Sequence, residues 1–356
     1  MLVQICCSID SHYFLSQLQN DFPDELIEGF FYDPNIHPYS EYRLRYEDVK
    51  YSCAKLGIKL YEGDYEIKSW LKAIKGHENE PEKGSRCNLC FEHRLETTIK
   101  KAIELGHSSY TTTLLISPQK SQEKLELEAK KLEEKYPNIK WIFKDYRSGN
   151  GLELQAKDVK ENNLYRQNYC GCMFALSQQR DMQSIYTSEL ISPITKQILP
   201  NSIEERLKLY HLRNRYEEEN RAYKIYKKSI QNYRLLSGSV SIKKTIIPSY
   251  ILFYSRLKPK VAKVKVEFIQ DDIYYMNKNE IRMMSLETLN ERLKTNYKDV
   301  LELLRNPLNI DDEISLRDSF DFSPIIVLDE INEETKYEIK IDSVLYEDTK
   351  SIISLA

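Results

Sequence analysis

The sequence predicts an α/β domain with a mostly parallel sheet, followed by a second, small α+β domain. Its 356 residues exceed the length of an average single domain. Through residue 185, short apolar runs alternate with amphipathic stretches, which is typical of strands joined by right-handed helical crossovers. The composition changes after about Leu190, where a tyrosine-rich basic segment follows. We therefore place one domain at residues 1–190 and a second at residues 191–356.

Apolar runs and the stop signals after them define the elements of the first domain. The first strand ends at two adjacent cysteines, and the second ends before Asp33-Pro34, a turn signal. The helix after it ends before Gly57, which suits a helix C-terminus. In order, we expect a strand at Met1–Cys6, a strand at Gly29–Tyr32, a helix from about Ser40 to Leu56, a strand at Ile58–Tyr61, a helix at Cys87–Leu105, a strand at Ser109–Leu115, a helix at Ser121–Tyr136 and a strand at Lys140–Phe143.

The second domain combines a long basic segment with shorter strand-like runs. Ile203–Leu236 has the length and charge of a helix, whereas Thr245–Ile269 alternates as strands do. Leu286–Leu304 predicts a helix again, and Pro324–Leu328 and Tyr337–Asp342 predict strands. We therefore expect a linker helix followed by a small α+β fold.

The charge of the chain is unevenly distributed. Between Arg206 and Lys265 there are 16 Lys or Arg and 3 Asp or Glu, whereas residues 266–356 contain 10 and 21. A basic block of this density is typical of a nucleic-acid contact. It is equally typical of a solvated helix face, and the acidic end could pair with it internally. From charge alone, both interpretations stay open.

The remaining composition indicates a cytosolic protein without a membrane partner. Apolar residues make up 41% of the chain and charged residues 30%, an ordinary composition for a soluble protein with a core. The N-terminus has no basic and apolar signal-peptide pattern, and no run approaches 18 apolar residues. Thiols in the cytosol are reduced, so structural disulfides are a weak explanation of the cysteines.

Six of the seven cysteines form three short pairs, namely Cys6-Cys7, Cys87-x-x-Cys90 and Cys170-Gly171-Cys172. Four thiolates would satisfy one zinc ion or one iron–sulfur cluster, so six favour a redox enzyme over a structural zinc site or a thioredoxin-like pair. The middle pair shares one face at the start of a helix, where thiolates are favoured. The seventh, Cys53, lies within a predicted helix and suits the core.

Polar residues follow several predicted strands, where sites of parallel sheets form. Asp10 comes three residues after Cys7 and offers a hard oxygen ligand within reach of the same turn. Asp33-Pro34-Asn35, Thr112-Thr113 and Asp145-Tyr146-Arg147 would lie at the same edge of the sheet. The cysteines and these polar groups could therefore converge.

The motifs resemble the cobalamin-independent epoxyqueuosine reductase family of the QueH type through about residue 180. The matching segments occur in the family's order, and the last of them is very specific. They are Ile5-Cys6-Cys7 with Asp10, Phe31–Pro38 with Glu41, Tyr42 and Arg45, Arg86-Cys87-x-x-Cys90, Thr112–Pro118, Lys144–Arg147, and Leu164–Cys172. The family is usually short, so the C-terminal half departs from it as an extension. Ser8-Ile9 stands where Ala-Pro is common, and Asp10 where some members have Cys.

This resemblance implies reduction of epoxyqueuosine to queuosine at the wobble position of tRNA. It implies a Rossmann-like fold that holds a [4Fe–4S] cluster and a nearby second metal, without cobalamin. The tRNA would bind through its anticodon loop with the modified base extruded, because the base must leave its stack to reach a buried cluster. The sequence does not identify the electron donor.

The resemblance also suggests roles for single residues. We expect Cys87, Cys90, one of Cys6 and Cys7, and one of Cys170 and Cys172 to hold the cluster. The leftover thiolates and Asp10 would hold a mononuclear iron, which acts as a Lewis acid on the epoxide oxygen. Candidates for the proton donor are Asp145, Tyr165 and Tyr169, although both tyrosines could simply pack beside the metal. Arg147 and Arg166 could bind tRNA phosphates or a carboxylate, and Asn35 and His37 could line the base pocket or merely form a turn.

Two other functions compete with this one. An ATP-dependent tRNA sulfur-transfer enzyme with a cluster would need a glycine-rich phosphate loop after the first strand, where this chain has Cys6–Ser11 and no glycine. A zinc-stabilised RNA-binding module would hold a colourless, redox-silent metal. In the reductase, the basic block and its tyrosines could contact tRNA, or the tyrosines could pack the linker helix.

Overall fold

The computed structural model describes residues 1–184, 198–252, 261–320 and 323–356. The chain forms two compact units. The first contains Met1–Ile191, Arg206–Tyr223 and Leu355–Ala356, and the second contains Ser192–Glu205 and Lys224–Ser354. No helix of the described residues is long and apolar enough to cross a lipid bilayer.

A five-stranded parallel sheet forms the centre of the first unit. Its order is β3-β2-β1-β4-β5, as in Rossmann-type sheets, and all four strand pairs are parallel. The strands are β1 (Leu2–Ile5), β2 (Glu28–Phe31), β3 (Leu60–Glu62), β4 (Ser109–Thr112) and β5 (Lys140–Trp141). β1, β2 and β4 are buried along their full length, as expected for a sheet covered on both faces. The predicted α/β fold with a parallel sheet is confirmed.

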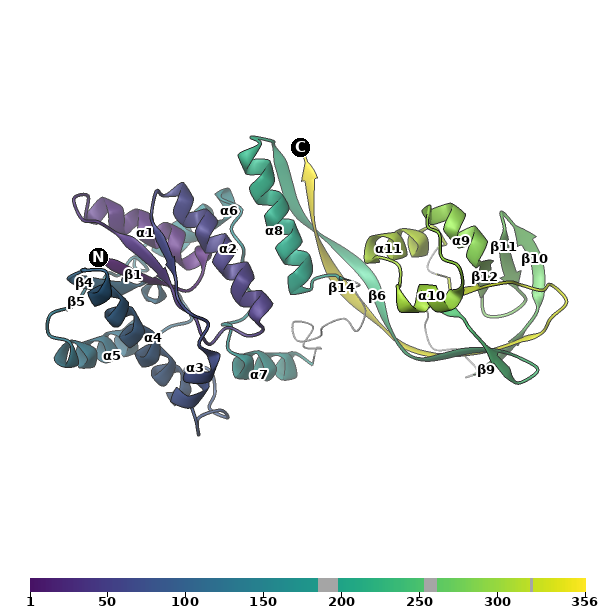
Figure 1. Cartoon of the computed structure of the whole chain (residues 1–356), viewed down its shortest axis with the longest axis horizontal. Coiled ribbons are helices and arrows are strands. Elements are labelled where there is room, and N and C mark those ends of the chain that lie inside the picture. The colour runs from purple at the N-terminus through teal and green to yellow at the C-terminus, as the bar shows by residue number, and fades with distance from the viewer. Residues whose placement is uncertain (185–197, 253–260, 321–322) are drawn as a thin grey trace. The chain divides into compact units, whose positions relative to one another are not determined.

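Helices connect and cover these strands (Figure 1). Helix α1 contacts α2 and α6, and α4 contacts α5. The helices are α1 (Ser8–Asp21), α2 (Tyr39–Lys55), α3 (Ile67–Ala73), α4 (Ser85–Glu104), α5 (Gln122–Lys135), α6 (Gly151–Glu161), α7 (Met173–Gln183) and, spanning the boundary of the units, α8 (Ile203–Glu218). Cys53 of α2 is buried in the core, as predicted.

The strand expected at Ser109–Leu115 is too long. β4 ends at Thr112, whose hydroxyl accepts a hydrogen bond from the Leu114 amide (3.2 Å) and so caps the 3₁₀ turn η1 (Thr113–Leu115). The chain therefore turns at the carboxyl end of β4. The strand order reverses between β1 and β4, so the ends of these two strands form the crevice where parallel sheets place their sites.

The described residues of the second unit form two sheets and three helices after α8, which confirms the predicted α+β architecture. One sheet has the order β10-β11-β12-β13-β8 and the other the order β7-β6-β14-β9. Apolar side chains of both sheets share one core, which includes Val240, Met283 and Ile339. The strands are β6 (Tyr223–Ile242), β7 (Thr245–Ile247), β8 (Tyr250–Leu252), β9 (Val261–Val264), β10 (Val266–Gln270), β11 (Ile273–Met276), β12 (Arg282–Ser285), β13 (Ile325–Leu328) and β14 (Tyr337–Leu355), and the helices are α9 (Leu286–Leu293), α10 (Val300–Arg305) and α11 (Ile310–Asp318).

The long helix expected at Ile203–Leu236 is wrong in its second half. Helix α8 ends at Glu218, because Asn220 adopts a left-handed backbone conformation (φ 51°) and Arg221 donates to the Tyr216 carbonyl (2.8 Å). From Tyr223 onward the chain is strand β6, which runs beside β14 as a long ribbon (Figure 1). The tyrosine, isoleucine and valine residues of this segment suit a strand, and the tyrosine spacing misled the sequence prediction.

Two smaller differences between the predicted and the observed elements have local causes. The helix expected at Leu286–Leu304 divides into α9 and α10, because Lys294 ends α9 in a left-handed conformation (φ 54°) and Asp299 caps α10. The last strand extends beyond Asp342 because β6 gives it a partner of similar length.

Candidate metal centre

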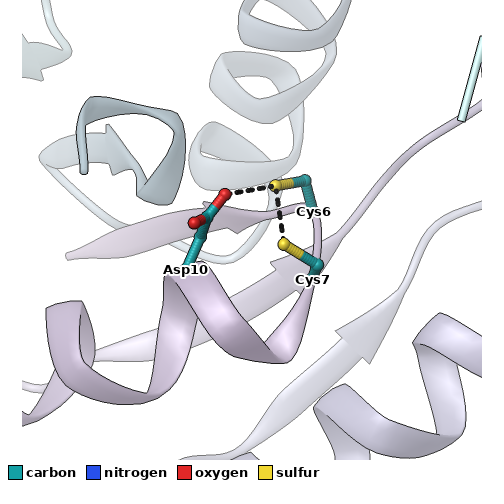
Figure 2. Close-up of side chains that lie close together, drawn as sticks. All are labelled: Cys6, Cys7 and Asp10. Carbon is teal, nitrogen blue, oxygen red and sulfur yellow. Dashed lines mark hydrogen bonds between the residues drawn. The ribbon is translucent and has the colours of Figure 1, made fainter. Parts of the chain in front are cut away.

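The first group of candidate ligands lies where β1 meets α1. Cys7 is the N-cap of α1, so Cys6 and Cys7 occupy the turn between strand and helix, as predicted. The Cys6 and Cys7 sulfurs are 3.6 Å apart, and the Cys6 sulfur lies 3.8 Å from Asp10 Oδ2 (Figure 2). One ligand atom from each of the three residues lies within 4.8 Å of the other two. The Thr113 hydroxyl, at the end of β4, lies 4.0 Å from the Cys6 sulfur.

These three side chains are buried together, and burial disfavours the charged forms of Cys7 and Asp10. Burial, a hydrogen bond with Cys6 and the charge of Asp10 all raise the pKa of Cys7 well above its ordinary value. Burial also raises the pKa of Asp10, although hydrogen bonds from Cys7 and Gln155 act in the opposite direction. Cys7 and Asp10, buried beside the Cys6 sulfur, need either protons or a bound cation. A metal ion would therefore displace the protons and satisfy all three groups.

The second group consists of two cysteines at the start of α4 and two in the loop before α7, namely Cys87, Cys90, Cys170 and Cys172. Burial and the charge of Cys170 both raise the pKa of Cys87. Burial raises the pKa of Cys90 to about 12, with smaller contributions from Cys170 and Cys172. Cys90 and Cys172 also belong to one apolar cluster with Trp70. The structure thus brings these two cysteine pairs together.

Gly171 holds the loop between its two cysteines against the segment after β2. Ile36 pairs with Cys172 through an isolated antiparallel bridge, and the His37 amide donates to the Gly171 carbonyl (2.8 Å). Gly171 has φ 106°, and a Cβ atom there would lie 2.8 Å from the Ile36 side chain. Only glycine suits this position, so the Cys-Gly-Cys spacing is a steric requirement of the fold.

Three buried cations lie among the thiols. The Lys120 ammonium donates to the Cys170 sulfur (3.1 Å). Burial acts to raise the pKa of Cys170, but Lys120 lowers it below the ordinary thiol value. Arg45 donates to the carbonyls of Tyr169 (2.9 Å) and Cys170 (3.1 Å). Arg94 pairs with Asp33 and is 3% exposed.

Sequence reasoning missed Arg94 and Lys120. Arg94 follows Cys90 by four residues on α4 and therefore lies on the helix face that carries both cysteines, which is a usable signal. Lys120 follows the Thr112–Pro118 segment in a loop, where no periodicity predicts the direction of its side chain.

A cavity of about 370 Å³ joins the two groups. Cys6 and Asp10 line it from the start of α1, and Cys170 lines it from the opposite loop. Its polar lining also includes Arg45, Glu82, Arg94, Lys120, Arg166, Gln167, Asn168, Tyr169 and Gln179. The cavity is therefore lined by thiols, two carboxylates and several cations.

The residues of the site fit an anionic, thiolate-ligated metal cofactor. Nη2 of Arg94 faces Asp33, whereas the buried Nε makes no hydrogen bond within the part of the chain that the structure describes. Buried guanidinium donors without acceptors are costly, and the sulfur atoms of a cluster are acceptors of the right charge. The softness of the thiolates favours iron or zinc over magnesium or calcium.

The residues predicted to bind the substrate have different surroundings. Asn35 is buried, and its Oδ1 has no hydrogen-bond partner among the described residues. Burial lowers the pKa of His37, whose carbonyl accepts from the Tyr169 hydroxyl (2.7 Å).

The two predicted arginines differ in their exposure. Arg147 donates to the carbonyls of Leu115 (2.8 Å) and Lys120 (3.1 Å) and thus holds the loop that carries Lys120. Arg166 is an exposed cation on the cavity lining.

Of the three predicted proton donors, one lines the cavity and two do not. Tyr169 lines the cavity. The Tyr165 hydroxyl is buried and donates to Glu41 (3.0 Å), while Arg206 donates to it (3.1 Å). Asp145 is exposed and accepts hydrogen bonds from Gln122, from Ser148 and from the Arg147 amide. These bonds, that of Ser148 first, lower the pKa of Asp145 to about 2.

Comparison with known proteins gives one consistent family. Residues 1–179 match the family described as Epoxyqueuosine reductase QueH. The protein of that name from Helicobacter pylori (strain ATCC 700392 / 26695) is 42% identical over 98% of this chain and 98% of its own length. The protein of the same name from Thermotoga maritima is 38% identical over 51% of this chain and 92% of its own length. The C-terminal extension is therefore shared with the H. pylori relative and lies outside the match with the T. maritima relative.

One solved structure with a similar chain trace is the U34-tRNA thiolase NcsA from Methanococcus maripaludis with its [4Fe-4S] cluster. It is 17% identical, covers 52% of this chain and 65% of its own, and has a TM-score of 0.34. This likeness is too low to bear on function.

Proposed function

Because this chain belongs to the epoxyqueuosine reductase QueH family, we propose that it reduces epoxyqueuosine to queuosine in tRNA with the three cysteine pairs as metal ligands. It is accordingly an oxidoreductase of queuosine biosynthesis. The observation that supports the role of the cysteines is the shared cavity, which has Cys6 and Asp10 on one side and Cys170 on the other. A tRNA substrate also implies that the protein is located in the cytoplasm.

The reaction removes one oxygen atom from the substrate. The two C–O bonds of the epoxide break, a cyclopentene double bond forms, and the oxygen leaves as water. Two electrons and two protons balance the change. The electrons come from a separate donor. When bound, a [4Fe–4S] cluster supplies single electrons and a mononuclear iron supplies a Lewis acid.

We assign the metal ligands by the two groups that the fold brings together. The second group would hold the cluster through Cys87, Cys90, Cys170 and Cys172. The first group would hold the mononuclear iron through Cys6, Cys7 and Asp10, whose ligand atoms lie within 4.8 Å of one another. This partition is simpler than the one expected from sequence, which divided each of the outer pairs between the two metals.

The protein's own groups must deliver a proton to the leaving oxygen. We propose Tyr169 for this step, because it lines the cavity and its hydroxyl makes a hydrogen bond with a backbone carbonyl that it can exchange for the substrate. Tyr165 and Asp145 then have positioning roles. Tyr165 links Glu41 to Arg206, and Asp145 fixes the turn that presents Arg147 to the loop of Lys120.

The substrate would enter through the cavity mouth. The exposed guanidinium of Arg166 suits a phosphate of the anticodon loop. Asn35 and His37 lie beside the Cys-Gly-Cys loop and would line the pocket of the extruded base. The base must be unstacked because Cys6 and Asp10 are buried.

The extension would add phosphate contacts. Lys224, Lys227 and Lys228 of β6 are exposed, and Tyr226 is exposed between them. A ribbon with lysines and an aromatic ring suits the backbone and the bases of an RNA loop. The acidic residues 266–356 would not contact the tRNA, because their negative charge repels its phosphates.

Anaerobic turnover tests this function. The full-length protein is incubated with dithionite and tRNA that carries epoxyqueuosine, and nucleosides are then analysed by mass spectrometry. We expect conversion of epoxyqueuosine to queuosine, the loss of one oxygen atom. Cys90→Ser should abolish conversion, whereas Cys53→Ala, which removes a core thiol outside the site, should not. No conversion by an iron-loaded wild type would reject the proposal.

A further inference from the structure

Helix α8 lies beyond the family match yet packs as part of the first unit. The match ends at residue 179, whereas Arg206–Tyr223 groups with residues 1–191. Two arginines of α8 are buried in that unit. Arg213 is 0% exposed, and Arg206 is 9% exposed. Buried arginines need specific partners, and the partners of these two lead toward the cysteines.

Arg213 is connected to both cysteine-bearing segments through Asp48 of α2. Its Nη1 donates to Asp48 Oδ1 (2.6 Å) and to the Asn163 carbonyl (2.8 Å). Asp48 Oδ2 accepts from the Ser8 hydroxyl and from the Tyr165 amide (2.8 Å). Ser8 directly follows Cys7, and Tyr165 begins the segment that ends in Cys170 and Cys172.

Arg206 starts a second chain of hydrogen bonds. Its Nη1 donates to the Tyr165 hydroxyl (3.1 Å), which donates to Glu41 (3.0 Å). Glu41 also accepts from Arg45 Nε (2.8 Å). Arg45 in turn donates to the carbonyls of Tyr169 and Cys170. An unbroken series of buried hydrogen bonds therefore runs from the extension to the backbone of a metal-ligand loop.

We propose that Arg206 and Arg213 are positioning residues of the metal centre, supplied by the extension rather than by the family domain. Both paths end on segments that carry cysteines, and both pass through buried carboxylates that need a cation. The α8 network, meaning these two arginines with Asp48, Tyr165, Glu41 and Arg45, sets the spacing of Cys7 and Cys170. The inference rests on the proposed function for the identity of the bound group.

The test uses full-length, anaerobically purified variants. Arg206→Gln removes the cation from Tyr165. Arg213→Lys keeps a charge opposite Asp48 but cannot reproduce the planar fork, whose Nε and Nη2 also bind the Asn214 side chain. Tyr165→Phe breaks the Arg206 path at its middle without adding bulk. Arg215→Gln is the matched control, because Arg215 is an exposed arginine on the same helix. We measure the rate of iron loss to a chelator, the electron paramagnetic resonance spectrum after reduction, and the thermal midpoint.

We expect the three network variants to lose iron about tenfold faster and to give altered spectra, as is usual for residues that orient metal ligands. Arg215→Gln should match the wild type. Wild-type chelation rates and spectra in Arg206→Gln and Tyr165→Phe would overturn the proposal, even with a lowered thermal midpoint, because α8 would then be structural only. These two variants decide the matter if Arg213→Lys does not fold.

A second readout is independent of the metal. Amide hydrogen exchange of residues 169–172 reports the mobility of the ligand loop directly. Faster exchange by about tenfold in the network variants, without change in Arg215→Gln, supports the positioning role even in a protein that holds no iron. Absence of iron from the wild type would reject the proposed function alone, whereas unchanged exchange would reject the α8 network.

Discussion

The ammonium of Lys120 lies 3.1 Å from the sulfur of Cys170, inside a cavity that Cys6 and Asp10 also line. Lys120 is largely buried, and although burial acts to lower its pKa, the charges of Cys170 and Glu82 raise it, so the lysine stays charged. A fixed cation beside a ligand sulfur stabilises the more negative, reduced state of a metal centre.

Lys120→Met should therefore shift the reduction potential of the bound centre to more negative values, because the reduced state loses a favourable charge. Potentiometric titration followed by electron paramagnetic resonance measures this shift. Lys130→Met is the control, since Lys130 is exposed on α5 and pairs only with Glu126 among the described residues. Equal potentials in the Lys120 variant and the wild type would show that the contact does not tune the centre.

Gly171→Ala should disrupt the loop that holds Cys170 and Cys172. The added methyl would contact the Ile36 side chain, and φ 106° is unfavourable for any other residue. We expect iron affinity to fall by about tenfold or more. Gly57→Ala is the matched control for Gly171→Ala, because Gly57 also has positive φ (67°) but has no atom within 4 Å of the added carbon. That control should lose about 1–2 kcal/mol of stability and keep its iron.

Asp10→Asn tests the mononuclear site. Asparagine preserves the shape of the side chain and can still accept from Gln155, which donates to Asp10 Oδ1 (3.0 Å). It is a much weaker ligand, so the protein should lose about one iron per chain and most of its turnover. The exposed Asp24→Asn should change neither. Full iron content together with full turnover in Asp10→Asn would remove Asp10 from the mechanism.

The exposed lysines of strand β6 give a fourth prediction. Replacing Lys224, Lys227 and Lys228 by glutamine in the full-length protein should weaken tRNA binding and lower the slope of log affinity against log salt by about 2. The control replaces three exposed lysines of the same unit, Lys278, Lys294 and Lys298. Similar losses in both triple variants would mean that β6 has no special role. Truncation at residue 190 would be a poorer test, because it also removes Arg206 and Arg213.

The sequence predicted the parts of the site that depend on local order. A strand that ends at Ile5 must place Cys6 and Cys7 in the next turn, and a helix that starts at Ser85 must place Cys87 and Cys90 on one face. The convergence of these segments follows from a parallel sheet, whose strand ends share one edge.

The missed features depend on tertiary contacts. Arg213 lies more than 160 residues from Asp48 in the chain, so no local pattern links the two. Strand β6 was mistaken for helix because its tyrosines and lysines fit both periods, and only the pairing with β14 decides between them. Lys120 belongs to a loop whose direction is set by Arg147, which binds two of the loop's carbonyls.

Metal analysis of the anaerobically purified protein tests the central claim most directly. Iron, sulfide and zinc are assayed together with the visible spectrum. We predict a brown protein that absorbs broadly near ~400 nm, is bleached by dithionite, and holds about four or five irons per chain. A colourless protein with about one zinc per chain would contradict the account, because the cysteine pairs would then form a structural site without redox chemistry.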